Sequence, residues 1–216
     1  TGGSAQGADQ TTISQTLTNT ISAPATATYN VTPLLGTCQG VPFTITVTVN
    51  PRPSVTNRTA AICSGGTFIV TPSSGGGNIV PSGTTYTWTT PVSNPVGAIT
   101  GGSDQTTGQP SISQTLTNVT NASATATYNV TPLSGTCQGV PFTITVTVNP
   151  RPAVTNMTAT ICSGGTFTVT PENVTNGIVP VGTTYTWGNP VISPLGAITG
   201  GSAQGADQTT ISQTLT

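Results

Sequence analysis

The sequence predicts an all-β protein built from tandem β-sandwich repeats of 99 residues. Threonine alternates with apolar residues over long stretches, which is the pattern of strands with one buried face. No window shows the apolar spacing of a helix, and the abundance of Thr, Val, Pro and Gly disfavours helices. The third observation is a fixed period, since equivalent landmarks stand 99 residues apart: Tyr29 and Tyr128, Cys38 and Cys137, Cys63 and Cys162, and Trp88 and Trp187.

Two proline-rich segments divide the chain into three parts. Asn50-Pro51-Arg52-Pro53 and Asn149-Pro150-Arg151-Pro152 each follow a long alternating run, and paired prolines cannot continue a sheet ladder. We therefore predict the C-terminal half of a β-sandwich repeat in residues 1–52, a complete repeat in residues 53–150 and the N-terminal part of the next repeat in residues 151–216. Because residues 1–18 and 199–216 are identical, we expect the chain to be an excerpt from a longer array.

The strands of the complete repeat are expected where β-branched or aromatic runs are bounded by Gly, Pro, Ser or Asn. We expect about seven short strands, of which the clearest cover residues 55–62, 68–71, 84–89, 112–116, 124–130 and 142–148. The last two alternate most strictly, and the Pro- and Gly-rich residues 131–141 between them predict a long loop that closes a hairpin.

The aromatic residues are expected to form the core. Tyr86 and Trp88 lie two positions apart and share a strand face, and a Trp on a third strand between two sheets is the arrangement of immunoglobulin-like domains. An alternative is a sugar-binding platform, which would need the rings of Tyr86 and Trp88 on the surface. The core aromatics that we predict are Tyr86, Trp88, Tyr128, Phe142, Tyr185 and Trp187.

The charged residues exclude many functions. The chain has three Lys or Arg, four Asp or Glu and no His, with a net charge of −1. Without His or Lys it cannot form a Ser/His/Asp triad, a His-ligated zinc site, a Schiff base or a phosphate-binding P-loop. No basic patch is available for nucleic acid. We therefore expect no enzyme activity, no cofactor and no metal, since the acids Asp9, Asp104, Glu172 and Asp207 are isolated from one another.

The four cysteines, Cys38, Cys63, Cys137 and Cys162, are candidates for disulfides in an extracellular array. A bond between Cys63 and Cys137 would close a long loop within one repeat. An immunoglobulin-like strand order would instead place these two thiols roughly 15–25 Å apart, well beyond bonding range. A bond from the Cys63 type to the Cys137 type of the next repeat is the alternative, and the sequence leaves both open.

The remaining sequence signals concern membranes and glycans. No stretch approaches the roughly 18 consecutive apolar residues that a membrane span needs, so we expect no membrane insertion. Sequons of the form Asn-x-Ser/Thr occur at Asn30, Asn57, Asn118, Asn121, Asn129, Asn156 and Asn173. A Thr-rich sequence produces many such sequons by chance.

Four segments of the repeat carry a family resemblance. They are ICSGGTF at residues 62–68, TYTW at 85–88, TYNVTP at 127–132 and GTCQGVPF at 135–142. In these segments the chain resembles the PKD-like, immunoglobulin-like repeats of very large secreted surface proteins of Bacteroidetes. The resemblance implies a β-sandwich module, export by the type IX route and use as a stalk or filament in adhesion, including adhesins of the gliding-motility type.

Sequence and resemblance together predict an extracellular structural repeat at the cell surface. The partners that we expect are neighbouring repeats of the same chain and further copies in a homo-oligomeric or filamentous assembly. The alternative function is a multivalent module that binds carbohydrate or another surface, for which surface glycans would be the partner.

Overall fold

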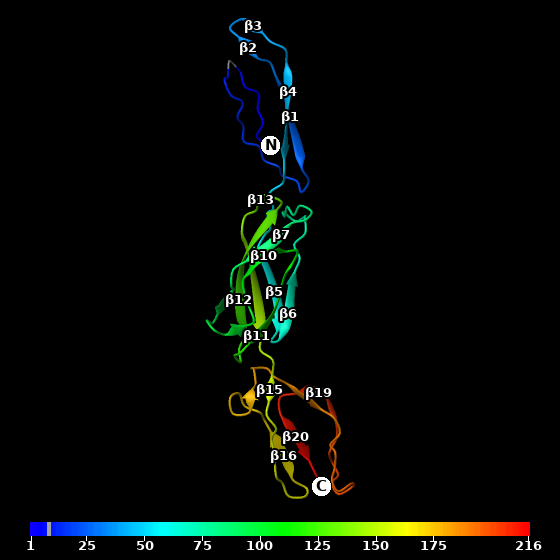
Figure 1. Ribbon diagram of the computed structural model, residues 1–216. Coiled ribbons are helices and arrows are strands. Elements are labelled where there is room, and N and C mark those ends of the chain that lie inside the picture. The colour runs from blue at the N-terminus through cyan, green and yellow to red at the C-terminus, as the bar shows by residue number, and fades with distance from the viewer. Residues whose placement is uncertain (8–9) are drawn as a thin grey trace.

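The computed structural model describes residues 1–7 and 10–216 as three units placed end to end along one long axis (Figure 1). The first unit ends at the linker of residues 50–53, and the last unit begins after the linker of residues 149–152. The N-terminus belongs to one end unit and the C-terminus to the other (Figure 1). The described residues contain strands, turns and bends but no helix, so the predicted all-β class is confirmed.

The middle unit is a sandwich of two sheets. The larger sheet has the strand order β10-β7-β12-β14-β5, with β8 and β13 also paired to β12, and the smaller has the order β6-β11-β9. All of these pairs are antiparallel except β14 with β5. The strands are β5 (Arg58–Cys63), β6 (Gly66–Val70), β7 (Thr85–Trp88), β8 (Val92–Asn94), β9 (Ile99–Thr100), β10 (Gln105–Gln109), β11 (Ile112–Asn118), β12 (Ala124–Ser134), β13 (Cys137–Gln138) and β14 (Phe142–Asn149).

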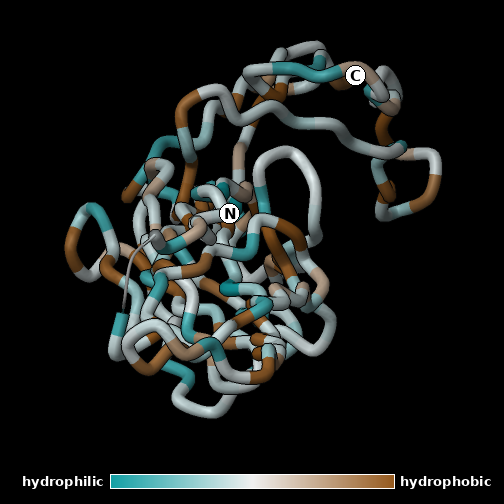
Figure 2. Tube along the Cα trace, turned by 90° about the horizontal axis from the view of Figure 1, so that it is seen from above, coloured by the Kyte–Doolittle hydropathy of each residue, from teal (hydrophilic) through white to brown (hydrophobic). Residues whose placement is uncertain are grey.

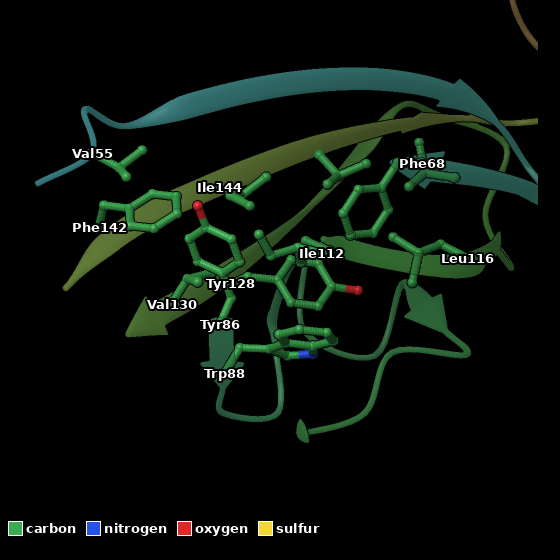
Figure 3. Packing of buried hydrophobic residues seen from close by; sticks show 13 residues of the cluster. Val55, Phe68, Tyr86, Trp88, Ile112, Leu116, Tyr128, Val130, Phe142 and Ile144 are labelled. Carbon is green, nitrogen blue, oxygen red and sulfur yellow. The ribbon is translucent and has the colours of Figure 1, made fainter. Parts of the chain in front are cut away.

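Alternation along β12 and β14 builds the core between the two sheets. The two strands pair with Ala124 opposite Val148 and Tyr128 opposite Ile144, so their apolar residues share one face. The threonines between them lie on the other face and are partly exposed. Side chains from both sheets meet in this core (Figure 3). Its thirteen buried residues are Val55, Phe68, Tyr86, Trp88, Ile112, Leu116, Ala126, Tyr128, Val130, Phe142, Ile144, Val146 and Val148.

The two end units contain different halves of the same sandwich. The N-terminal unit has the hairpin of β1 (Ala25–Val31) and β4 (Phe43–Val49), with β2 (Leu34–Leu35) and β3 (Cys38–Gln39) at its tip. The C-terminal unit has six short strands: β15 (Ala153–Val154), β16 (Thr166–Val169), β17 (Gly177–Ile178), β18 (Tyr185–Trp187), β19 (Gln204–Gln208) and β20 (Ile211–Thr214). Of these, β16, β18, β19 and β20 stand where β6, β7, β10 and β11 stand in the middle unit, whereas the residues equivalent to β5 form no strand.

Several details differ from the sequence prediction. The first strand begins at Arg58 rather than at residue 55, and the short strands β8, β9, β10 and β13 were not expected. The loop predicted at residues 131–141 is shorter, because β12 continues to Ser134 and turns at Gly135 into β13. Gly135 has a φ of +56°, a conformation that glycine adopts easily, and this permits the tight turn.

Hydrophobic residues form short stretches that occur throughout the chain. Seen along the long axis, brown hydrophobic stretches alternate with teal and white ones in all parts of the chain (Figure 2). This pattern suits thin sandwiches, in which every second residue of a strand faces the core. No helix in the described part of the chain is long or apolar enough to span a bilayer.

Candidate functional site: the junctions between units

The linker before the middle unit is fastened to the upper end of that unit. Pro51 and Pro53 are both buried, and Pro53 is among the most completely buried residues. Between them, the exposed Arg52 donates a hydrogen bond from Nε to the carbonyl oxygen of Gln138, 2.6 Å away. Gln138 belongs to β13, the short strand at the top of the sandwich (Figure 1). The chain therefore enters the middle unit in a defined direction.

Gly139 makes this close approach of the linker possible. Its N–H donates a hydrogen bond to the carbonyl oxygen of Pro132 at 2.8 Å, which holds the turn against the linker. A Cβ at Gly139 would collide with the carbonyl oxygen of Pro53 and would lie 2.7 Å from the Pro132 ring. Any larger side chain must therefore displace the linker or the turn.

The linker after the middle unit lies beside the turn that joins β5 to β6. Ser64 donates its backbone N–H to the carbonyl oxygen of Asn149 at 2.8 Å. Cys63, the turn and the linker enclose a shallow groove of about 390 Å³. In contrast to Pro51 and Pro53, Pro152 and the residues after it are exposed. The positions equivalent to Gln138 and Gly139, 99 residues further along the repeat, lie beyond Thr216.

The four candidate disulfide cysteines are unpaired thiols in the structure. Cys63 lies opposite Asn149 at the lower end of β14, whereas Cys137 precedes the upper end of that strand. The length of β14 separates them by about 23 Å, at about 3.3 Å per residue. A disulfide needs Cα atoms within about 7 Å, so the pairing of Cys63 with Cys137 inside one repeat is not compatible with this fold. The pairing between consecutive repeats stays a prediction.

The structure places the aromatic residues of the middle unit in the core rather than on the surface. Tyr86 is 1% exposed and Trp88 7% exposed, and the Trp88 indole N–H donates to the carbonyl oxygen of Ser103 at 3.0 Å. Phe68 packs on Tyr128 with ring centroids 5.1 Å apart, and Tyr86 packs edge-on against Phe142 at 6.3 Å (Figure 3). A sugar-binding platform formed by Tyr86 and Trp88 therefore does not exist in this unit.

In the C-terminal unit the equivalent rings are less protected. Tyr185 and Trp187 are only partly buried, although Trp187 repeats the indole hydrogen bond with the carbonyl oxygen of Ser202 at 3.2 Å. The strand that covers Trp88 in the middle unit is β12, which pairs with β7. Its counterpart is missing beside β18, which explains the exposure of these rings.

Two buried tyrosines of the core differ in their polar contacts. The Tyr128 hydroxyl donates to Oε1 of Gln114 at 2.9 Å. The Tyr86 hydroxyl has no hydrogen-bond partner among the residues that the structure describes. Burial raises the pKa of both phenols above the usual value for tyrosine, because the phenolate would lose its hydration.

Asn118, the first residue of an Asn-x-Thr sequon, has a structural role in the middle unit. It is 4% exposed, and its Nδ2 group donates to the carbonyl oxygens of Ala122 at 2.8 Å and Val148 at 2.7 Å. This amide is therefore engaged in the folded unit and does not face solvent. No local sequence signal distinguishes this role, although Asn19, 99 residues earlier, donates to the carbonyl oxygens of Ala23 and Val49 in the same way.

The acidic residues do not come together. No group of three or more His, Cys, Asp or Glu that could hold a metal ion occurs within the described ranges. Asp104, Glu172 and Asp207 belong to this described part, whereas Asp9 lies outside it. The features that the structure defines best are the core of the middle unit and the linker of residues 50–53 held at its upper end.

Comparison with known proteins identifies the family. The chain matches the model of the PKD-like domain over residues 1–53 and 60–152, and both matched segments end at the last proline of a linker. The search of curated proteins finds no match. PKD-like domains are typical of extracellular surface proteins. The match covers more than half of the sequence and agrees with the all-β architecture, and the chain therefore belongs to the PKD-like domain family.

Proposed function

We propose that this chain is an extracellular, nonenzymatic stalk segment of a very large cell-surface adhesin, such as the adhesins used in gliding motility. The observation that carries this proposal is the end-to-end placement of units by the linker of residues 50–53 (Figure 1). Buried prolines, the Arg52 contact with Gln138 and the close approach at Gly139 hold this linker against the next unit. Units joined in this way extend the molecule in one direction.

The repetition of the sequence also supports a structural role. Catalysis needs one constellation of unlike groups, whereas this chain repeats hydroxyl and apolar residues at equivalent positions. The repeated residues include the alternating apolar and threonine positions of β14, which recur in β4. Each additional unit would increase length and would add little new chemistry.

Small-angle scattering on the monomeric fraction of the chain tests the stalk role. A domain of about 100 residues has a radius of gyration of about 13 Å, so three units in line should give a maximum dimension on the order of 100 Å. The matched control replaces Pro51 and Pro53 together by glycine, which should free the linker and broaden the distribution of dimensions. The proposal would be contradicted if the natural chain and the glycine variant gave the same distribution of dimensions. A compact particle for the natural chain would contradict it as well.

Surface location is tested separately on cells of the source organism. Antibodies against the middle unit should label intact cells as strongly as permeabilised cells, and external protease should remove the label. Labelling that requires permeabilisation would exclude a role at the cell surface.

A further inference from the structure

We propose that copies of this chain associate side by side through an ion pair between Arg58 of one copy and Asp104 of its neighbour. Arg58 is the first residue of β5, and Asp104 immediately precedes β10. These strands lie at opposite ends of the larger sheet of the middle unit. The middle unit has a linker on each side, so both edges belong to a complete repeat, and the association does not depend on the stalk role.

Both charges stand at open edges of the sheet. Within the described part of the chain, β5 pairs only with β14, and β10 pairs only with β7. No other strand of the middle unit therefore covers the outer side of either one. An unpaired edge of this kind is where a second chain can approach a sheet.

Arg58 and Asp104 are the only charged residues between residues 53 and 150. One edge of the sheet therefore carries a single positive charge and the opposite edge a single negative charge. Two copies placed with unlike edges together bring opposite charges face to face, whereas contacts between like edges bring together charges of the same sign. This complementarity favours a second copy of the chain as the partner.

The two residues cannot pair within one unit. Four steps between neighbouring strands separate β10 from β5, which amounts to about 19 Å at about 4.8 Å per step. The Nε of Arg58 is buried and has no hydrogen-bond partner among the residues that the structure describes. An unpaired buried donor of a charged group is costly. Arg58 as a whole is half-buried and Asp104 is exposed, so a carboxylate can reach Arg58 from outside the unit.

The strand register places both charges at nearly the same height. Measured on β12, Arg58 lies at the level of Tyr128, and Gln105 lies at the level of Val130. Since β10 and β12 are both antiparallel to β7, they run in the same direction, and Asp104 lies one residue below Gln105. The levels of Arg58 and Asp104 therefore differ by about 3.3 Å, the length of one residue. A copy that is displaced sideways without rotation brings the two charges together.

Comparison of the repeats supports a contact between these positions. In the C-terminal unit, Met157 takes the place of Arg58 and Ala203 takes the place of Asp104. The two charges are thus present together in one repeat and absent together in the other. Residues that change together are expected to be in contact. Because the distance across the sheet excludes contact within a unit, a contact between molecules accounts for this pattern.

The proposed association has two physical consequences. A single exposed ion pair contributes little to binding, so we expect weak association that salt suppresses. Each middle unit offers one edge of each sign, so the contact is heterologous and can continue into rows of copies that point in the same direction. Arrays that contain several such units would gain avidity from the repeated pairs.

Light scattering of the full chain over a range of concentrations tests the proposal. At an ionic strength of about 0.01 M, where the Debye length is about 30 Å, the apparent mass should rise with concentration above 21.5 kDa. At about 1 M, where the Debye length is about 3 Å, this rise should be lost. Arg58→Met and Asp104→Ala, which introduce the residues of the C-terminal unit, should each abolish the salt-dependent rise. Asp207→Asn is the matched control, because it removes a carboxylate from β19, the counterpart of β10, and should retain the rise.

Exchange of the charges provides the second test. Arg58→Glu and Asp104→Arg each place like charges opposite one another, so neither variant should associate alone. Their equimolar mixture should associate, and so should the double variant, because both restore opposite charges at the contact. Native Trp88 fluorescence verifies that each variant is folded. Three results would overturn the proposal: no salt-dependent rise for the natural chain, a rise that the Arg58→Met or Asp104→Ala variant retains or the Asp207→Asn variant loses, or a folded double variant that fails to associate.

Discussion

The hydroxyl of Tyr128 donates a hydrogen bond to Oε1 of Gln114, 2.9 Å away, and thereby joins the two sheets of the middle unit. Tyr128 lies on β12 of the larger sheet and Gln114 on β11 of the smaller. Gln114 also accepts from the backbone N–H of Ser103 and donates to its carbonyl oxygen, at 3.0 and 2.9 Å. The side chain therefore connects three segments of the sandwich at the edge of its apolar core.

Removing this hydroxyl should destabilise the middle unit. We expect Tyr128→Phe to lower the free energy of unfolding by about 1 kcal/mol, the usual net value of one hydrogen bond. Tyr86→Phe is the matched control, because the Tyr86 hydroxyl is buried without a partner in the described residues and its loss should be neutral or stabilising. Guanidinium unfolding followed by Trp88 fluorescence, in a Trp187→Phe background, measures both. Equal losses in the two variants would contradict this assignment.

The middle unit should lose stability in alkali. Burial raises the pKa of Tyr86 and Tyr128 in the folded unit above the value in the unfolded chain, which is about 10. The folded unit therefore keeps protons that the unfolded chain releases. This contribution to stability is constant below about pH 10 and is lost as the pH rises toward the folded pKa values. The sequence has no lysine to titrate in the same range.

The measurement for this prediction is a pH titration with two signals, phenolate absorbance and Trp88 fluorescence. Ionisation of the two buried tyrosines should coincide with the loss of native fluorescence, and the double variant Tyr86→Phe, Tyr128→Phe should move the transition to higher pH. Phenolate absorbance that develops fully while the native fluorescence persists would argue against it.

Gly139 should be sensitive to a single methyl group. In Gly139→Ala the new Cβ meets the Pro53 carbonyl and the Pro132 ring, and we expect a loss of about 1–3 kcal/mol in unfolding free energy. Gly40→Ala is the control, because Gly40 occupies the same turn of the N-terminal unit and its Cβ would contact Pro33 but no linker. Denaturant unfolding should show a larger loss of unfolding free energy for Gly139→Ala than for Gly40→Ala, and scattering should show a larger change in the dimensions of the chain. Equal effects of the two substitutions would indicate that the turn alone is responsible.

Consecutive repeats should be joined by disulfides in a longer array. Cys63 lies beside the linker of residues 149–152, and Cys137 lies next to Gln138, which holds the linker of residues 50–53. The lower thiol of one unit and the upper thiol of the next therefore flank the same linker. An array made by continuing the chain after Thr216 with residues 19–216 would place the second copy of Cys38 across the linker from Cys63.

Refolding of this array with oxidised glutathione tests the bond. The two thiols would give up two electrons and two protons, and glutathione disulfide would be reduced to two thiols. A nonreducing peptide map should show Cys63 linked to the second copy of Cys38. A link between Cys63 and Cys137, or free thiols throughout, would refute the arrangement. The 216-residue chain, in which these partners are missing, should keep its thiols free.

The parts of the fold that could be predicted from sequence are those with a local signal. Strict alternation of apolar residues with threonine identified β12 and β14. β10 has the sequence QTTGQ, which has no apolar alternation, and its pairing with β7 depends on distant residues. The parallel pairing of β5 with β14 is likewise non-local. The roles of Gln114 and Asn118 could not be recognised, because their partners come together only in the folded sandwich.

The parallel pairing of β5 with β14 has a mechanical consequence. The chain enters the middle unit at one end and leaves it at the other, so tension along the molecule pulls these two neighbouring strands in opposite directions along their length. The hydrogen bonds between β5 and β14, which join the residues from Arg58 with Ile144 to Cys63 with Asn149, are then strained together in shear and cannot open one after another. We expect the unit to withstand higher force when it is pulled through its two linkers than when the hairpin of β12 and β14 is peeled from its turn, a difference that single-molecule force spectroscopy can measure.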